Sequence, residues 1–142
     1  MTEVAPFDEL DPRTLYALLR LRVDVFVVEQ AAPYPDLDGR DTEPGTRHVW
    51  SVDADGGVSA YLRMLAEPDG TVRIGRVCTD PKARGQGLAA TLMARALDEA
   101  GERTVVLDAQ SYLCDFYRGF GFTPSGPEFL DDGIPHVPMR RE

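Results

Sequence analysis

The feature that most limits the possible folds of this chain is a glycine turn between a strand-like run and a helix-like run. Residues 71–79 are rich in β-branched side chains, and the helical pattern of residues 85–100 begins directly at Gly85 and Gly87. The first N–H groups of a helix have no partner inside it, and the helix dipole makes that end partly positive. Glycines leave these groups open to a phosphate because no Cβ covers the backbone. The segment therefore predicts a strand–turn–helix unit that can hold a phosphate, with Arg84 adding a positive charge.

Two better-known phosphate-binding patterns fit this turn less well. Gly85 to Ala90 matches the loose dinucleotide pattern G-x-G-x-x-A, and Asp108 lies at a suitable distance for a ribose contact. In dinucleotide-binding folds, however, the first glycine follows its strand closely, whereas residues 80–84 intervene here. A Walker-type loop is excluded because no Lys-Ser or Lys-Thr follows the glycines. A tight turn without a ligand remains the structural alternative, and a dinucleotide-dependent oxidoreductase remains the alternative enzyme class.

A first helix is predicted over residues 12–28. Asp11 is typical of an N-cap, and Pro12 is typical of the first helical position. The side chains expected to form its buried face are Leu15, Leu19, Val23 and Phe26. Residues 31–47, which are rich in Pro, Asp and Gly, predict a long loop of the kind that is usually functional or disordered.

The rest of the chain predicts a mixed sheet with helices on its faces. Two hairpin signals, Asp55-Gly56-Gly57 and Pro68-Asp69-Gly70, separate three β-rich runs, so these runs are expected to pair as antiparallel strands. The expected strands are residues 48–53, 58–65, 71–79 and 104–109, with final pieces at 122, 128–130 and 137–140, and the expected later helices are 85–100 and 113–120. Antiparallel strands followed by β-α-β-α-β indicate the α/β class, with residues 1–142 forming a single domain.

Composition limits the class of protein and its partners. The 142 residues suit one domain, and a net charge of −9 disfavours nucleic acid as a partner. Residues 71–95 are locally basic and can still hold a small polyanion. No signal peptide or membrane span is expected, and Cys78 and Cys114 suit a reduced compartment, so the predicted location is cytoplasmic. The cysteines, His48 and His136 lack metal-ligand spacing, so no metal is expected.

Two motifs carry a resemblance to a known family. Arg84, Gly87 and Ala89 occupy the named positions of R/Q-x-x-G-x-G/A, the signature of the GNAT superfamily of N-acetyltransferases. The segment FYRGFGF, residues 116–122, resembles the superfamily's Y-x-x-x-G-F segment and follows in the expected order. Either motif alone is weak, whereas the two together are specific. Segments along nearly the whole chain also resemble the ElaA group of that superfamily: LYALLRLRVDVFVVEQ, PYPDLDG, RHV, IGRV and DGIPHVPM.

The resemblance implies direct transfer of an acetyl group from acetyl-CoA to an amine. In the superfamily, acetyl-CoA lies in a V-shaped gap between two splaying parallel strands, which here would be residues 74–79 and 104–109. The first strand would pair its backbone with the pantetheine arm, imitating one more strand, and the turn amides would hold the pyrophosphate. The residues implied to contact acetyl-CoA are Val77, Cys78, Thr79, Arg84, Gly85, Gln86, Gly87, Leu88 and Ala89. A non-catalytic acetyl-CoA sensor is the alternative function, and homodimers are common in the superfamily.

The resemblance also implies catalytic roles. Tyr117 is similar to the superfamily's general acid, which gives a proton to the departing thiolate. Several members use a strand carboxylate as base, but the matching stretch contains Arg76, which cannot accept a proton at working pH. His48 is therefore the predicted base, with Glu29, His136 and ordered water as alternatives. Glu29 and His136 are also predicted to contact the acceptor.

Acidic side chains concentrate in the long loop and near the end of the chain. If they rim the acceptor cleft, they would attract a cationic amine of a small molecule or a peptide, whereas such clusters usually form only solvated surface. The residues are Asp36, Asp38, Asp41, Glu43, Glu128, Asp131 and Asp132.

Overall fold

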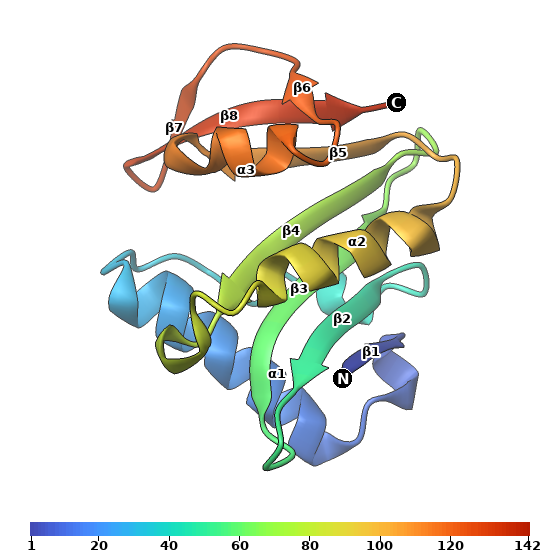
Figure 1. The fold of residues 1–142 in the computed structure, drawn as a ribbon, viewed down its shortest axis with the longest axis vertical. Coiled ribbons are helices and arrows are strands. Elements are labelled where there is room, and N and C mark those ends of the chain that lie inside the picture. Colours follow the sequence, from blue (N-terminus) through green and yellow to red (C-terminus); the bar gives the residue numbers. More distant parts are fainter.

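An eight-stranded, mostly antiparallel sheet runs through the protein (Figure 1). The structure is a computed structural model that describes residues 1–142. The strand order is β1-β2-β3-β4-β5-β8-β6, and β7 pairs with β8 outside this path. The strands are β1 (Thr2–Ala5), β2 (Arg47–Val52), β3 (Val58–Ala66), β4 (Val72–Thr79), β5 (Val105–Gln110), β6 (Thr123–Pro124), β7 (Phe129–Asp131) and β8 (Ile134–Arg141). The helices are α1 (Pro12–Val23), α2 (Leu88–Ala100) and α3 (Cys114–Arg118), and a wider π-helical segment (Asp24–Glu29) continues α1.

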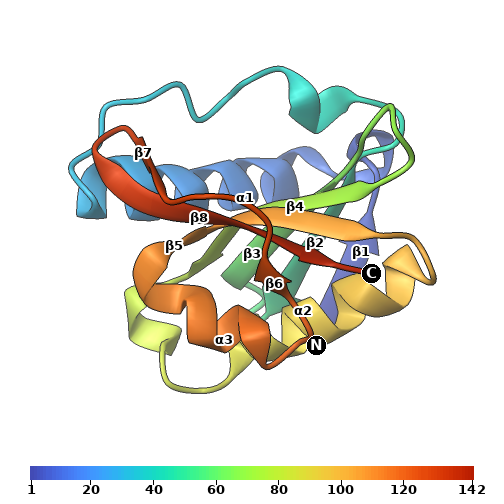
Figure 2. The ribbon, with the colours of Figure 1, turned by 90° about the horizontal axis from the view of Figure 1, so that it is seen from above.

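The helices cover both faces of the sheet and give the protein three layers (Figure 2). On one face, α1 buries Leu18 in a cluster that includes Tyr61 of β3. On the other face, α2 buries Leu92 and Met93 in a larger cluster that includes Leu62, the next residue of the same strand. Successive residues of a strand point to opposite faces, so β3 contributes to both clusters. This is the mixed α/β fold that the sequence predicts. None of the helices combines the length and the apolar character that a membrane crossing requires.

The two parallel strands at the centre of the sheet separate soon after they meet (Figure 1). β4 and β5 pair only at Val72 with Val105 and at Arg73 with Val106. Beyond Arg73 the edge of β4 that faces β5 therefore has no strand partner. A β-bulge accompanies the separation: the register between β3 and β4 shifts after Tyr61, and Arg76 adopts a φ of +54°. The splayed strand pair predicted from the sequence is thus present.

The first helix buries a different face from the one predicted. α1 ends at Val23 rather than Val28, and the π-helical segment changes the winding after it. Of the predicted inward residues, Leu15, Leu19 and Phe26 are half-buried and Val23 is exposed. The buried residues of the segment are Leu18, Leu21, Arg22 and Val25. The prediction was wrong because the buried stripe contains a charged residue, Arg22, which a search for apolar periodicity passes over.

Candidate active site

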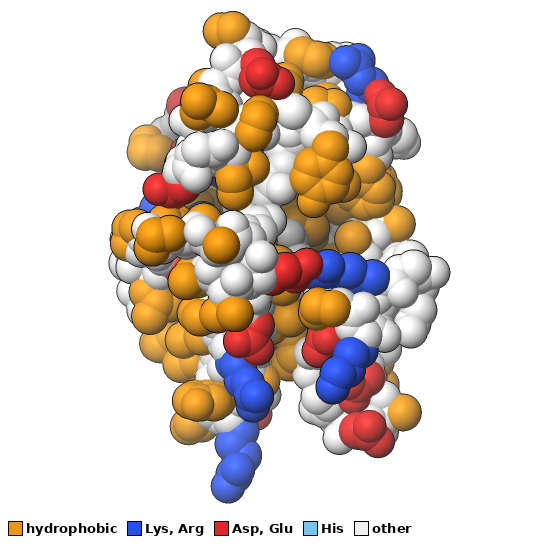
Figure 3. Space-filling view, turned by 90° about the vertical axis from the view of Figure 1, so that its left-hand side faces the viewer, with side chains coloured by type: hydrophobic (Ala, Val, Ile, Leu, Met, Phe, Trp, Pro, Cys, Tyr) orange, Lys and Arg blue, Asp and Glu red, His pale blue; other side chains and the backbone are white.

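A cavity of about 200 Å³ lies where β4 and β5 diverge. Its walls come from both strands, from α3, from the end of the π-helical segment and from the β7–β8 hairpin. The polar side chains of the lining include Arg73, Arg76, Asp108, Tyr117, Asp131 and His136. The face seen in Figure 3 carries apolar side chains with acidic and basic ones scattered between them. Neither sign of charge dominates this side of the molecule.

Tyr117 reaches this cavity from α3 and is 5% exposed. Its ring meets Phe116 and Phe122 edge to face, with ring centroids 5.1 Å and 6.2 Å away. No hydrogen bond within the chain engages its hydroxyl, although the hydroxyl belongs to a buried side chain. Burial raises the pKa of Tyr117 well above its usual value, so the hydroxyl keeps its proton near neutral pH. Tyr117 therefore has the protonation state that a proton donor needs.

The glycine turn before α2 leaves backbone N–H groups uncovered. α2 begins at Leu88 rather than at Gly85, because Gly85 and Gly87 both adopt positive φ, +83° and +75°. No atom lies within 4 Å of the place where a Cβ would stand at either glycine. No side chain caps α2, so its first N–H groups have no partner in the chain. The turn provides the open, partly positive backbone that a pyrophosphate requires.

Arg84, at the start of this turn, is held by Glu29 from the end of the π-helical segment. Two hydrogen bonds of 2.6 Å join the guanidinium and the carboxylate, and Arg84 Nε also donates to the Thr79 carbonyl oxygen. The hydrogen bonds from Arg84 lower the pKa of Glu29. Glu29 does not line the cavity, so its predicted contact with the acceptor has no support from its position. It lies instead beside the glycine turn.

Cys78 is a packed strand residue. Its side chain is 5% exposed and belongs to the cluster under α1, with Leu18 and Tyr61. Burial raises the pKa of the thiol well above its usual value, so the thiolate form is suppressed. A nucleophilic role is therefore disfavoured, and only the backbone of Cys78 is available on the open edge of β4.

His136 lines the cavity together with Tyr117. It comes from β8, and its ring stacks on Phe129 of β7 at a centroid distance of 5.8 Å. Its Nδ1 lies 2.7 Å from the carbonyl oxygen of Ile134. A carbonyl oxygen only accepts, so Nδ1 carries the proton in this contact and Nε2 keeps a free lone pair when the ring is neutral. Of the three side chains considered as a base, His136 is the one that the structure brings to the cavity.

His48 lies elsewhere, in the interior between β2 and the long loop. The residue is 1% exposed and does not line the cavity. Its Nδ1 is 2.5 Å from the Tyr61 hydroxyl, and its Nε2 is 3.0 Å from the Asp41 carbonyl oxygen. Burial lowers its pKa, and both ring nitrogens are occupied. This position argues against His48 as the base and corrects the expectation from the sequence.

Comparisons with known proteins agree with this geometry. Residues 20–142 match the family model described as an acetyltransferase (GNAT) domain. The chain belongs to this family. Both motifs that carried the resemblance, at residues 84–89 and 116–122, lie within the matched range.

Individual relatives show which members of the GNAT family this protein resembles. A UPF0039 protein of Mycobacterium tuberculosis is 54% identical over 136 residues, which are 94% of this chain and 87% of that protein. Protein ElaA of Escherichia coli is 42% identical over 142 residues, 94% of this chain and 91% of that protein. The ElaA crystal structure has a TM-score of 0.93, covering 100% of this chain and 99% of that one. An acyl-CoA N-acyltransferase from Pseudomonas aeruginosa has a TM-score of 0.94 at 42% identity, with the same coverage. The ElaA-like resemblance is confirmed, and these neighbours support acyl transfer.

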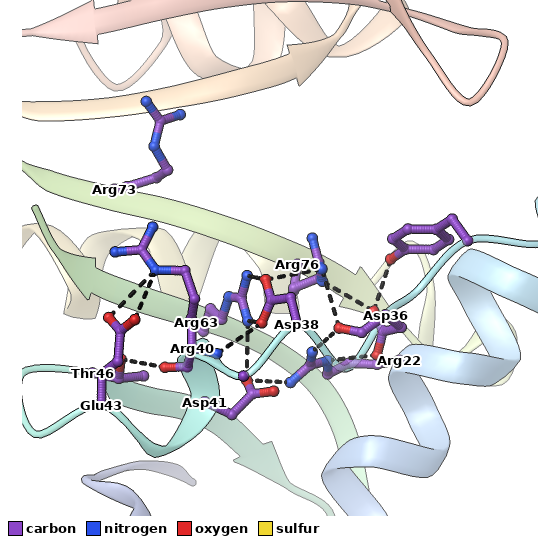
Figure 4. A network of polar contacts seen from close by, with 12 residues as sticks. Arg22, Asp36, Asp38, Arg40, Asp41, Glu43, Thr46, Arg63, Arg73 and Arg76 are labelled. Carbon is purple, nitrogen blue, oxygen red and sulfur yellow. Dashed lines mark hydrogen bonds and ion pairs between the residues drawn. The ribbon is translucent and has the colours of Figure 1, made fainter.

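In this GNAT protein the acidic loop is paired with arginines rather than open to solvent (Figure 4). The fully buried Arg22 donates to Asp36 at 3.0 Å and to Asp41 at 2.6 Å. Arg63, from β3, donates to Asp41 and to Asp38. Three guanidinium groups and three carboxylates thus balance one another once Arg76, which pairs with Asp36 and Asp38, is included. The charges of these three loop carboxylates are therefore balanced, so the loop does not offer them as free attractors of a cationic amine. Asp131 and Asp132, from the same predicted set, do line the cavity.

Proposed function

We propose that this protein is an acetyl-CoA-dependent N-acetyltransferase that moves an acetyl group directly to a primary amine. The observation that carries the proposal is the cavity at the open edge of β4, because it contains both a neutral tyrosine hydroxyl and a histidine whose Nε2 has no hydrogen-bond partner in the chain. Membership of the GNAT family supports the reaction class, and the P. aeruginosa neighbour is described as an acyl-CoA N-acyltransferase. The choice of acetyl-CoA as donor is part of this proposal.

The chain offers suitable partners for each part of acetyl-CoA. The unpaired edge of β4 at Val77 to Thr79 presents backbone groups to an extended pantetheine arm. The glycine turn from Arg84 to Ala89 presents N–H groups to the pyrophosphate. Bound acetyl-CoA would supply an acyl thioester, which an uncharged amine can attack.

Two side chains would handle the protons of the transfer. As the new C–N bond forms and the C–S bond breaks, His136 Nε2 would accept the proton that the amine nitrogen loses. The Tyr117 hydroxyl would give a proton to the departing sulfur. Tyr117 and His136 come from different elements, α3 and β8, and both line this cavity.

Replacing Gly87 by Glu tests the binding half of the proposal. Isothermal titration is expected to show saturable acetyl-CoA binding to the wild type, with no binding of NAD or NADP. Gly87→Glu is expected to abolish it, because a carboxylate at the start of α2 repels the pyrophosphate and the side chain covers the amides. Gly70→Glu is the matched control, since Gly70 also has positive φ and open space around it but lies in the β3–β4 hairpin.

The outcomes separate the alternatives. NAD binding, or no acetyl-CoA binding by the wild type, would overturn the proposal. Acetyl-CoA binding without turnover of any amine would favour the sensor instead, because a sensor needs the same turn and strand edge but no acceptor chemistry.

A further inference from the structure

Two arginines of β4 line the cavity from the same side. In a regular strand Arg73 and Arg76 would point to opposite faces, because they are an odd number of positions apart. The bulge places both Arg76 and Val77 opposite Leu62 of β3, so the regular alternation of side chains along β4 is broken at Arg76. Both guanidinium-bearing residues consequently line the cavity wall. The β-bulge beside the splayed strands therefore places the positive charges of Arg73 and Arg76 on the same wall of the cavity.

Arg76 occupies a backbone conformation that favours glycine. Its φ of +54° is unfavourable for a residue that carries a side chain, so the surrounding structure must hold it in place. Arg76 Nε lies 3.0 Å from Asp36 Oδ1, Nη2 donates to the Asp36 carbonyl oxygen at 3.1 Å, and the guanidinium lies over the Tyr34 ring at 5.3 Å. Strained residues held by several contacts are concentrated at functional sites. The long loop therefore fixes the position of this arginine at the cavity.

Both guanidinium groups keep unused hydrogen-bond donors. Arg73 donates Nε to Glu67 and Nη1 to Asp108, each at the long distance of 3.3 Å, and its Nη2 has no partner. Arg76 donates hydrogen bonds through Nη2 alone; its Nε lies within ion-pair distance of Asp36 but makes no hydrogen bond, and its Nη1 has no partner. In Figure 4 Arg73 stands on the side of β4 that faces β5, and Glu67 connects it to Arg40 of the loop. Planar guanidinium groups with free N–H groups match the two oxygens of a carboxylate.

Other parts of the cavity carry groups suited to an amine. Asp131 and the neighbouring Asp132, at the β7–β8 turn, line the cavity with His136. The cavity therefore combines arginines on β4 with carboxylates and a histidine on the β7–β8 hairpin. Its volume of about 200 Å³ is smaller than the roughly 300–1,000 Å³ of pockets for drug-sized ligands, so it suits a small molecule.

We propose that the acceptor is a small primary amine that also carries a carboxylate, such as a free amino acid. Arg73 Nη2 and Arg76 Nη1 bind the carboxylate, and the amino group then faces His136 and Tyr117. This inference rests on the proposed acetyl transfer. The bonds formed and broken and the proton transfers are the same as those described under the proposed function. It narrows the acceptor from primary amines in general to zwitterionic ones.

Pairs of amines that differ only in the carboxylate test this inference. CoA release is measured with saturating acetyl-CoA and with phenylalanine against phenethylamine, leucine against 3-methylbutylamine, and lysine against cadaverine. The carboxylated member is expected to have a kcat/KM roughly tenfold higher or more in at least one pair, as charged hydrogen bonds typically give. Arg73→Gln is expected to lower that ratio roughly tenfold. Arg95→Gln, an exposed arginine of α2 outside the cavity, is the matched control and is expected to keep the wild-type ratio.

The change in the ratio between Arg73→Gln and the wild type is the decisive quantity. An α-amino group also loses its proton more readily than an alkylamine, and that advantage is the same in both proteins. A ratio near one in the wild type, or a ratio that Arg73→Gln leaves unchanged, would overturn the carboxylate site and leave the acetyl transfer standing. Acetyl-CoA binding is titrated in the same preparations. Binding without CoA release for any amine would overturn the proposed transferase function itself, and this inference with it.

Discussion

Tyr117→Phe is expected to lower kcat for acetyl transfer about 100-fold, at the low end of the usual contribution of a general acid. The affinity for acetyl-CoA should stay within about twofold, because the hydroxyl has no partner in the chain and the ring still packs against Phe116 and Phe122. Steady-state CoA release gives kcat, and isothermal titration gives the affinity. A loss in kcat at constant affinity identifies an interaction made in the transition state.

Tyr112→Phe is the control for this experiment. Tyr112 lies just before α3, is 77% exposed and does not line the cavity, so the same loss of a hydroxyl should leave kcat unchanged. If Tyr117→Phe turned over at the wild-type rate, Tyr117 would have no part in the mechanism. The sulfur would then have to take its proton from another group or from water.

Arg22→Met is expected to reduce the free energy of unfolding by about 3–5 kcal/mol, the usual cost of breaking a buried ion pair by removing one partner. Arg22 is fully buried and makes three hydrogen bonds, to the carboxylates of Asp36 and Asp41 and to the Asp36 carbonyl oxygen. Its loss leaves negative charge in the interior, because only Arg63 and Arg76 remain to compensate these carboxylates. Urea unfolding followed by circular dichroism measures the effect.

Arg20→Met provides the comparison on the same helix. Arg20 is exposed, and its pairing with Asp24 at 3.8 Å is a surface contact of the kind that contributes little. Equal stability of the two variants would mean that the network under the long loop does not stabilise the fold. A loss confined to Arg22→Met would also explain why the Asp-rich loop can be ordered without an apolar core of its own.

The elements nearest the glycine turn were predictable because local chemistry determines them. Glycines, hairpin turns and β-branched runs indicated β2 to β5 and α2 with small errors at their ends. β1 was not predicted, because it depends on a distant pairing of Thr2–Ala5 with β2 that no local pattern reveals. The buried face of α1 was predicted wrongly for the same kind of reason, since burial of Arg22 depends on two aspartates from a loop that follows it.

The sequence carries more information about the donor side of the candidate site than about the acceptor side. The motifs around Arg84 and Tyr117 predict acetyl-CoA and its proton donor through their resemblance to a family, and both stay predictions. The presence of His136 in the same cavity as Tyr117 depends on the pairing of β8 with β5, and the orientation of Arg76 depends on the bulge. Both are features of the folded sheet. A signal was nevertheless present in the sequence, because three arginines in core-forming segments were matched by three aspartates in one loop.

The most direct test of the account is mass spectrometry of a reaction that contains the purified protein, acetyl-CoA and a set of primary amines. The account predicts that one or more amines gain a single acetyl group while free CoA accumulates in equal amount. It also predicts that Gly87→Glu and Tyr117→Phe both suppress this product. Bound acetyl-CoA that stays intact with every amine, while the wild type remains folded, would contradict the transferase function.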